Sequence, residues 1–274
     1  MNAPKSTSTS QTVDLADGLV LSIDEYGDNT EGTAVLLLHG GAGPQSMSAF
    51  AAALSEHVYV VAPTHPGFDG TPRPESFDSV ADLATAYLDL LDTLELKGVM
   101  VIGNSLGGWI AAEMAQRDTH GRIGALTLID AIGIQADDEK ELVDIRGLPM
   151  EELGRLAFHD PATRLSPAAP DDKQQATMAA NGRAVAIYGG AAFTHDPKLR
   201  GRLHRVDVPV LVLWGEHDGI ATANYGRTYA DAFSHGHFVL VPEAGHLPQI
   251  EQMGRTLGAI GDFVDTVVKP PMSA

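Results

Sequence analysis

Short and almost wholly apolar runs, rich in β-branched residues, recur along the chain. They cover residues 34–38, 58–62, 99–102, 126–129, 209–213 and 238–241. A run of this length and composition is typical of a strand that is buried on both faces, as the strands of a parallel sheet are. The pattern therefore predicts a sheet with helices on both sides.

Helical patterns lie between several of these runs. The clearest has Leu83, Tyr87 and Leu91 on one face at helical spacing. Ser79, followed three residues later by Asp82, resembles the N-terminal cap of that helix. Because strands alternate with helices, the sequence predicts an α/β fold with a mostly parallel, doubly wound sheet.

The start of the chain has a different pattern. Residues 13–26 form two alternating runs separated by Asp17-Gly18, which predicts an antiparallel hairpin at an edge of the sheet. Residues 1–12 are mostly polar and lack the apolar segment of a signal peptide, so we expect a disordered leader there.

The alternation of strands and helices fails once, between Asp130 and Val208. A stretch of this length without a strand is better explained by an inserted lobe than by a loop. Within it, residues 150–158 and 171–188 have helical patterns. We therefore predict a core made of residues 13–130 and 208–268, with a helical cap at 131–207.

Charge and composition exclude several classes of protein. The chain has 36 acidic and 18 basic residues, a formal net charge of −18, and no cysteine. The negative charge disfavours nucleic acid and anionic membrane surfaces as partners. Polar residues interrupt the most apolar window, residues 98–115, which argues against a membrane span. We expect a cytoplasmic protein, whose oligomeric state the sequence leaves open.

A candidate nucleophile follows the run at 99–102. Gly103-Asn104-Ser105-Leu106-Gly107 matches the G-x-S-x-G pattern between a predicted strand and a small-residue helix. In this turn the serine takes a strained backbone conformation, and the flanking glycines leave room for neighbouring elements. The pattern predicts that the Ser105 hydroxyl is presented at the carboxyl end of the sheet.

A second glycine-rich turn, His39-Gly40-Gly41-Ala42-Gly43, follows the run at 34–38. Together the two turns predict an oxyanion hole, with the backbone N–H groups of Leu106 and Gly41 as donors. His39 itself is an alternative candidate for the catalytic base. A histidine that closes a buried strand more often holds a loop through hydrogen bonds, and we prefer that interpretation.

The acid and the base are expected later in the chain. Asp218 comes just after the run at 209–213, and His246 just after the run at 238–241. Both therefore lie at carboxyl ends of strands, where open α/β sheets carry their sites. Ser105, His246 and Asp218 then form a candidate triad. Asp130, at the end of the run at 126–129, is a rival acid, whereas Glu216 fits a solvated turn.

Other possible sites have weaker support. His235 and His237 form a pair without a third ligand nearby, so we predict no metal site there. No phosphate-binding or dinucleotide-binding glycine motif is present, and no cofactor is expected. The basic residues Lys198, Arg200, Arg202 and Arg205 are set among apolar ones and fit a solvated amphipathic face.

With these motifs together, the chain resembles the α/β-hydrolase superfamily from about Val13 to Val268. The resemblance implies a cap domain over the active site and a small-molecule acyl substrate. Relatives that hydrolyse epoxides or haloalkanes have an aspartate at the position of Ser105, so these activities are not expected. We predict a serine hydrolase that acts on a small, largely apolar carboxylic ester or similar acyl compound.

Two alternatives stay open. Related carbon–carbon bond hydrolases, which act on aromatic ring-cleavage products, share the Asn104-Ser105 pair and the cap. They typically have a tryptophan after the catalytic histidine, where this chain has Leu247, and a cap arginine, for which Arg183 is a candidate. The alternative from another class is a non-catalytic binding protein on the same fold.

Overall fold

A computed structural model describes residues 8–16, 18–29, 34–160, 162 and 171–268 of the chain. Its centre is an eight-stranded sheet in the order β1-β2-β4-β3-β5-β6-β7-β8. The strands are β1 (Thr9–Asp14), β2 (Val20–Tyr26), β3 (Ala34–Leu38), β4 (Tyr59–Pro63), β5 (Val99–Asn104), β6 (Ile123–Ile129), β7 (Val210–Gly215) and β8 (Gly236–Val241). β2 is antiparallel to both its neighbours, and the pairings from β4 to β8 are parallel.

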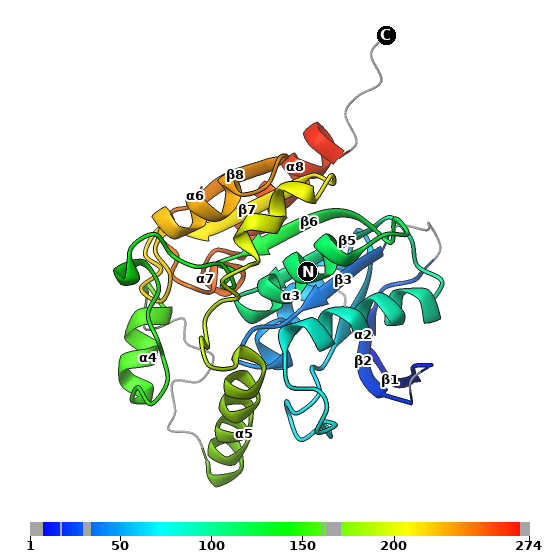
Figure 1. Cartoon of the computed structure of the whole chain (residues 1–274), viewed down its shortest axis with the longest axis horizontal. Coiled ribbons are helices and arrows are strands. Elements are labelled where there is room, and N and C mark those ends of the chain that lie inside the picture. Colours follow the sequence, from blue (N-terminus) through cyan, green and yellow to red (C-terminus); the bar gives the residue numbers. More distant parts are fainter. Residues whose placement is uncertain (1–7, 17, 30–33, 161, 163–170, 269–274) are drawn as a thin grey trace, which may run out of the picture.

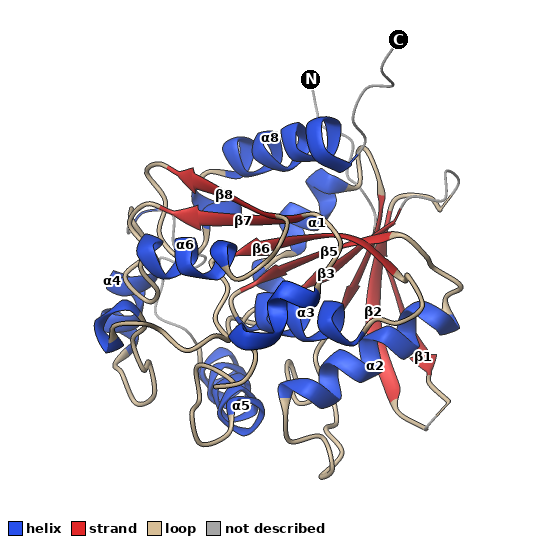
Figure 2. Ribbon diagram, turned by 45° about the horizontal axis from the view of Figure 1, so that its top comes forward, coloured by secondary structure: helices blue, strands red, loops and turns tan. Residues whose placement is uncertain are grey.

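Helices cover both faces of the sheet (Figure 2). They are α1 (Ser48–Leu54), α2 (Val80–Thr93), α3 (Leu106–Arg117), α4 (Met150–Ala157), α5 (Asp172–Gly189), α6 (Ala223–Asp231), α7 (Pro248–Glu251) and α8 (Met253–Phe263). Short 3-10 helices cover Pro44–Ser46, Glu139–Glu141 and Arg200–Arg205, and a π-helical turn covers Val264–Val268. No helix in the described ranges is long and apolar enough to cross a membrane.

Each face of the sheet has its own apolar core. Along β3, Leu36 and Leu38 belong to the core under α2, α3 and α6, whereas Val35 and Leu37 belong to the core under α1 and α8. Successive side chains of a strand point to opposite faces, so a wholly apolar strand supplies both cores. This arrangement confirms the predicted doubly wound sheet.

The local signals at α2 and at the first hairpin are confirmed. Ser79 and Asp82 form a capping box at the start of α2. β1 and β2 pair antiparallel at the sheet edge, with Val13 opposite Leu21. The predicted disordered leader, residues 1–12, is wrong from residue 9 onward. β1 begins at Thr9, and its polar residues pair with β2. Residues 1–7 lie outside the described part of the chain.

The segment between β6 and β7 adds no strand to the sheet within its described residues. It contains α4 and α5, which agree closely with the two predicted helices. Both helices lie beyond the carboxyl ends of the parallel strands (Figures 1 and 2). The helical insert is therefore present, and its division from the core at residues 131 and 207 stays a prediction.

Candidate active site

Ser105 occupies the turn between β5 and α3. Its backbone has φ of 53° and ψ of −114°, in the region of positive φ that residues with a side chain rarely adopt. A Cβ atom on Gly103 would overlap the carbonyl of Gly107, and one on Gly107 would overlap the carbonyl of Leu38. The two glycines thus allow the tight turn that the sequence predicted. Ser105 is partly exposed while its neighbours are buried.

The predicted acid and base are hydrogen-bonded to each other. Nδ1 of His246 lies 2.7 Å from Oδ2 of Asp218. Oδ1 of the same carboxylate accepts the backbone N–H groups of Ile220, at 2.8 Å, and Ala221, at 3.1 Å. The carboxylate is thereby fixed on both sides, and it holds the imidazole with its proton on Nδ1. Nε2 is then left as the basic nitrogen.

Asn104 connects the serine turn to the histidine loop. Its side-chain Nδ2 donates to the carbonyl of Ile129 at 3.1 Å and to the carbonyl of His246 at 3.2 Å. The backbone N–H of Ser105 also donates to Ile129, at 3.0 Å. One buried amide therefore joins the ends of β5 and β6 to the loop that carries the candidate base.

The two glycine-rich turns lie against each other, because β3 and β5 are paired with Leu38 opposite Gly103. A Cβ atom on Gly40 would lie 3.1 Å from Cβ of Ser105. Leu106 is the first residue of α3, where backbone N–H groups have no partner within the helix. The geometry suits the predicted donors Leu106 and Gly41, whose role stays a prediction.

His39 holds its own loop and is not placed as a base. Its Nδ1 lies 2.8 Å from the carbonyl of Gly40, and its Nε2 accepts the N–H of His65 at 3.1 Å. Burial lowers the pKa of His39 to about 4. The neutral ring therefore acts as the loop clamp that we preferred on sequence grounds.

His65 and Tyr87 extend this clamp. Nε2 of His65 lies 2.9 Å from the carbonyl of His39, and its Nδ1 is hydrogen-bonded to the hydroxyl of Tyr87. Burial, and to a lesser degree the neighbouring His39, lower the pKa of His65 well below its usual value. The sequence suggested no role for either residue, since the contacts join distant segments.

Asp130, the rival acid, lies beside the pair but does not bond to the imidazole. Its Oδ1 accepts the backbone N–H of Gly215 at 2.9 Å, and the residue is fully buried. Burial, followed by the charge of Asp218, raises the pKa of Asp130 well above its usual value. Glu216, the other acid considered, is exposed and lies near His217, as expected of a solvated turn.

Ligand atoms of Asp130, Asp218 and His246 lie within 4.8 Å of one another, close enough for a metal ion on distance alone. However, His246 Nδ1 and Asp218 are bonded to each other, and both oxygens of Asp218 have partners. Asp218 and Nδ1 of His246 are therefore already used within the protein. His235 and His237 belong to no such group in the described ranges.

The end of α4 is joined to both loops that carry the acid and the base. Gly219 donates its N–H to the carbonyl of Leu156 at 2.9 Å, and His246 donates to the carbonyl of Ala157 at 2.9 Å. A Cβ atom on Gly219 or Gly245 would come within 3 Å of these carbonyl oxygens. We call residues 156–160 the α4 strap. Its contacts use main-chain atoms, which the sequence pattern did not reveal.

Glu251 completes the α4 strap. Its carboxylate accepts the backbone N–H groups of Gly245 at 2.6 Å, Asp160 at 2.8 Å and His159 at 3.2 Å. Gly245 directly precedes His246, so this side chain ties the base loop to the helical insert. Such charge-assisted bonds are stronger than those between neutral groups.

α5 contacts the glycine-rich loop from the other side. Cγ2 of Val185 lies 3.3 Å from the position of a Cβ atom on Gly41. Asn181 accepts the N–H of Asp69 at 2.9 Å, and the hydroxyl of Tyr188 donates to Pro66 at 2.8 Å. Arg183, the candidate cap arginine, lies on the exposed face of this helix.

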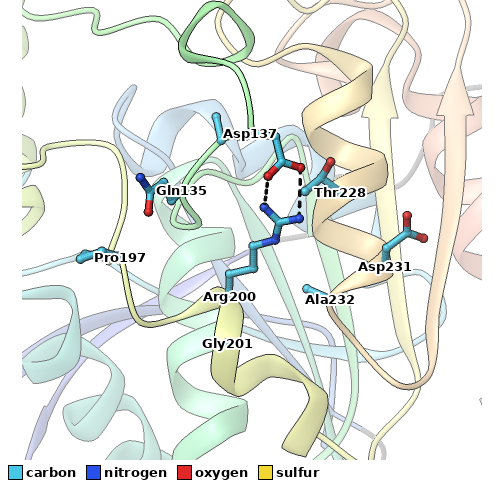
Figure 3. Close-up of a pocket in the computed structure, with 9 residues that line it drawn as sticks. Gln135, Asp137, Pro197, Arg200, Gly201, Thr228, Asp231 and Ala232 are labelled. Atoms are coloured by element: carbon cyan, nitrogen blue, oxygen red, sulfur yellow. Dashed lines mark hydrogen bonds and ion pairs between the residues drawn. The ribbon is translucent and has the colours of Figure 1, made fainter.

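The residues that line an open hollow of about 620 Å³ include none of the candidate catalytic residues (Figure 3). In it Arg200, one of the predicted basic residues, forms an ion pair with Asp137. Asp231 also lines the hollow. Because the guanidinium is paired and partly exposed, the solvated amphipathic face predicted for the basic residues fits this part of the structure.

Comparisons with known proteins identify the family of the chain. Residues 35–259 match the alpha/beta hydrolase family. The chain is 25% identical over 299 residues to a 2-hydroxymuconate semialdehyde hydrolase of Pseudomonas sp. (strain CF600), covering 96% of this chain and 97% of that protein.

Solved structures share the fold. A bacterial membrane phospholipase A has a TM-score of 0.75 at 24% identity, with 96% of this chain and 87% of that one covered. An esterase from Thermogutta terrifontis has a TM-score of 0.73 at 23% identity, with 93% and 98% covered. Since the family match spans most of the chain and the sheet has the corresponding architecture, this protein is a hydrolase of the alpha/beta hydrolase family.

Proposed function

We propose that the protein is a serine hydrolase that cleaves a small, largely apolar carboxylic ester or similar acyl compound. The observation that carries the proposal is the 2.7 Å hydrogen bond between His246 Nδ1 and Asp218 Oδ2. It lies at the same end of the sheet as the strained turn of Ser105, to which Asn104 joins it. A hydroxyl nucleophile needs such a base, because its own pKa is far above neutrality.

In the proposed reaction, the Ser105 hydroxyl oxygen attacks the substrate carbonyl carbon and its proton passes to Nε2 of His246. The electron pair of the carbonyl double bond moves onto the oxygen, which the N–H groups of Leu106 and Gly41 stabilise. Collapse of this intermediate breaks the ester bond, and the leaving alkoxide takes the proton from His246. Asp218 stabilises the imidazolium in the meantime.

Water then repeats the sequence on the acyl-enzyme. His246 takes a proton from the water as its oxygen attacks the acyl carbon, and the new intermediate collapses to release the carboxylic acid. The departing Ser105 oxygen recovers its proton from His246. Bonds, charges and protons balance without a cofactor, so the residues named here suffice for the chemistry.

Residues of α5 support an apolar acyl group. Val185 lies against Gly41, and Ala184 is buried one position before it. Apolar side chains beside the oxyanion loop suit an apolar acyl group and offer no charge to bind a second carboxylate. Arg183 points to solvent, which favours an ester over the carboxylate-bearing products of aromatic ring cleavage.

Carbon–carbon bond hydrolysis is the second candidate, and the match to the 2-hydroxymuconate semialdehyde hydrolase along nearly the whole chain favours it. Leu247 after the candidate base and the exposed Arg183 speak against it. The two candidates share the nucleophile and the base. They differ in substrate, so activity against p-nitrophenyl esters and ring-cleavage products in parallel separates them.

The test of the hydrolase mechanism is labelling with a fluorophosphonate probe, which reacts with activated serines. We expect the wild-type protein to take the label and to hydrolyse p-nitrophenyl esters, and Ser105→Ala to lose both. Ser234→Ala, at an exposed serine bonded to the carbonyl of His204, is the matched control and keeps both. A folded wild-type protein that takes no label contradicts the proposal.

A further inference from the structure

Asp130 is a buried carboxyl group that the proposed reaction does not use. It directly follows β6, with none of its surface exposed and φ of 44°. Its N–H donates to the carbonyl of Leu213 at 3.0 Å, and its Oδ1 accepts from Gly215 at 2.9 Å. A residue with a side chain at positive φ is strained. The two hydrogen bonds to β7 hold Asp130 in this conformation and fix its carboxyl group.

The second oxygen of Asp130 has an unusual environment. Oδ2 is buried and has no hydrogen-bond donor among the described residues. Oxygen atoms of Asp130 and Asp218 and a nitrogen of His246 lie within 4.8 Å of one another. Two ionised carboxylates at this distance, shielded from water, repel each other strongly. A proton on one of them would allow a hydrogen bond between the two carboxyl groups in place of the repulsion.

We propose that Asp130 is a positioning residue, which stays a neutral carboxylic acid in the folded protein and donates its proton to the carboxylate of Asp218. The proposal rests on the proposed function only in that Asp218 is the acid of the triad. Asp218 is the acceptor of the two, because its carboxylate already accepts two backbone N–H groups and the imidazole, all of which favour the ionised form.

The groups around Asp130 support this assignment. The charged groups that face it are Asp218 after β7 and Glu251 in α7, and both oppose a further negative charge. His246, after β8, is the titratable base of the same cluster. Burial is the largest cause of the raised pKa of Asp130, and the charge of Asp218 is the next.

The neutral state has a consequence for the base. Two negative charges within 4.8 Å of His246 would attract a positive charge on its ring more strongly than one does. A protonated ring cannot take the proton of Ser105. A neutral Asp130 leaves one negative charge beside His246 and a donor that fixes the orientation of Asp218.

Infrared spectroscopy tests the protonation state directly. A protonated carboxyl group has a carbonyl stretch well above the carboxylate bands, and at pH 7 the wild-type protein should show one. Asp130→Asn should lose this band, and Asp144→Asn, at an exposed aspartate paired with Arg146, should keep it. Absence of the band from the wild-type protein at pH 7 overturns the proposal, whether or not the variant folds.

The pH profile of kcat/KM separates a positioning role from mere support of the fold. Asn supplies the same acceptor and a neutral donor, so Asp130→Asn should keep the apparent pKa of the acid limb. If Asp130 were ionised in the wild type, Asp130→Asn would instead lower this apparent pKa by about one unit or more. That result would overturn the proposal. Asp130→Ala should lower kcat/KM about tenfold, and Asp130→Asn should restore most of the loss.

The two proposals fail separately. If the wild-type protein takes no fluorophosphonate label, the hydrolase mechanism fails, whereas the infrared band still reports whether Asp130 is protonated. If the label is taken and the band is absent, the mechanism stands and Asp130 is not the neutral donor.

Discussion

The imidazole rings of His39 and His65 stack with their centroids 3.7 Å apart, at the base of the loop that carries Gly40 and Gly41. Each ring bonds to the backbone of the other residue. Nδ1 of His39 donates to the carbonyl of Gly40 and its Nε2 accepts from the N–H of His65, so a proton on Nε2 would break the second bond. The ring of His39 therefore has to be neutral for the loop to keep its shape, and burial lowers the pKa of both rings.

This pair predicts a loss of stability in mild acid. A histidine with a lowered pKa in the folded state contributes its stability in full above its unfolded pKa of about 6.5, and the contribution falls as the pH drops below that value. From pH 7 to about pH 5.5, protonation linked to His65 should lower the unfolding free energy of the protein by about 1 kcal/mol. Urea unfolding at both pH values, with His65→Gln beside the wild type, checks this, and an equal pH dependence in both proteins would contradict it.

Asp130 predicts the opposite dependence on pH. An acid with a raised pKa in the folded state contributes stability below its unfolded pKa of about 3.9, and this is lost as the pH rises toward the folded pKa. The advantage of Asp130→Asn over the wild type should grow by up to about 1.4 kcal/mol per pH unit over that range. Unfolding free energies at pH 5 and pH 7 measure it. A constant difference would mean that Asp130 titrates normally.

Asp218→Asn should reduce ester turnover by about three orders of magnitude, because an amide neither fixes the Nδ1–H tautomer nor stabilises the imidazolium. Glu216→Gln removes an exposed carboxylate two residues earlier and should change turnover less than twofold. Steady-state kinetics on p-nitrophenyl esters compares the two variants. Similar rates in both would show that Asp218 is not the acid.

Glu251→Gln should weaken the α4 strap. The charged acceptor for Gly245, Asp160 and His159 is lost, with an expected cost of about 2 kcal/mol in unfolding free energy and a lower kcat, since His246 follows Gly245. Glu152→Gln, in the exposed pair with Arg155 on α4, is the control and should stay within about 0.5 kcal/mol of the wild type. Equal effects of the two changes would argue against the strap.

Replacement by alanine should have opposite effects on stability at two glycine positions. Gly107→Ala places a methyl group on the carbonyl of Leu38 and should cost about 3 kcal/mol or more, since backbone cannot easily yield. Gly182, in α5, has open space around its Cβ position, and alanine there should add about 0.5–1 kcal/mol of stability. Thermal unfolding of both variants measures the signs. A Gly107→Ala variant as stable as the wild type would mean that the turn is looser than described.

The strands and the candidate triad could be predicted because their signals are local. A wholly apolar run such as residues 34–38 is consistent with a doubly buried strand, and Ser105 has its glycines beside it in the sequence. Asp218 and His246 follow from the rule that parallel strands present their carboxyl ends at one edge.

The rest depends on contacts between distant segments. No pattern near Glu251 indicates that it binds residues 159 and 160, and nothing near Asp130 reveals the buried neighbours that change its ionisation. β1 was missed at Thr9 because its polar residues are held by pairing with β2 at an edge, which does not need apolar side chains.

The α4 strap also has a consequence for how this protein can diverge. Its links to the acid and base loops at residues 156 and 157 are made by carbonyl oxygens, which every amino acid possesses. These two links therefore set no requirement of their own on the side chains of Leu156 and the buried Ala157, whereas Glu251, Gly219 and Gly245 are constrained. Side chains on the exposed part of the α4 strap can thus change during divergence while the connection to the candidate triad persists.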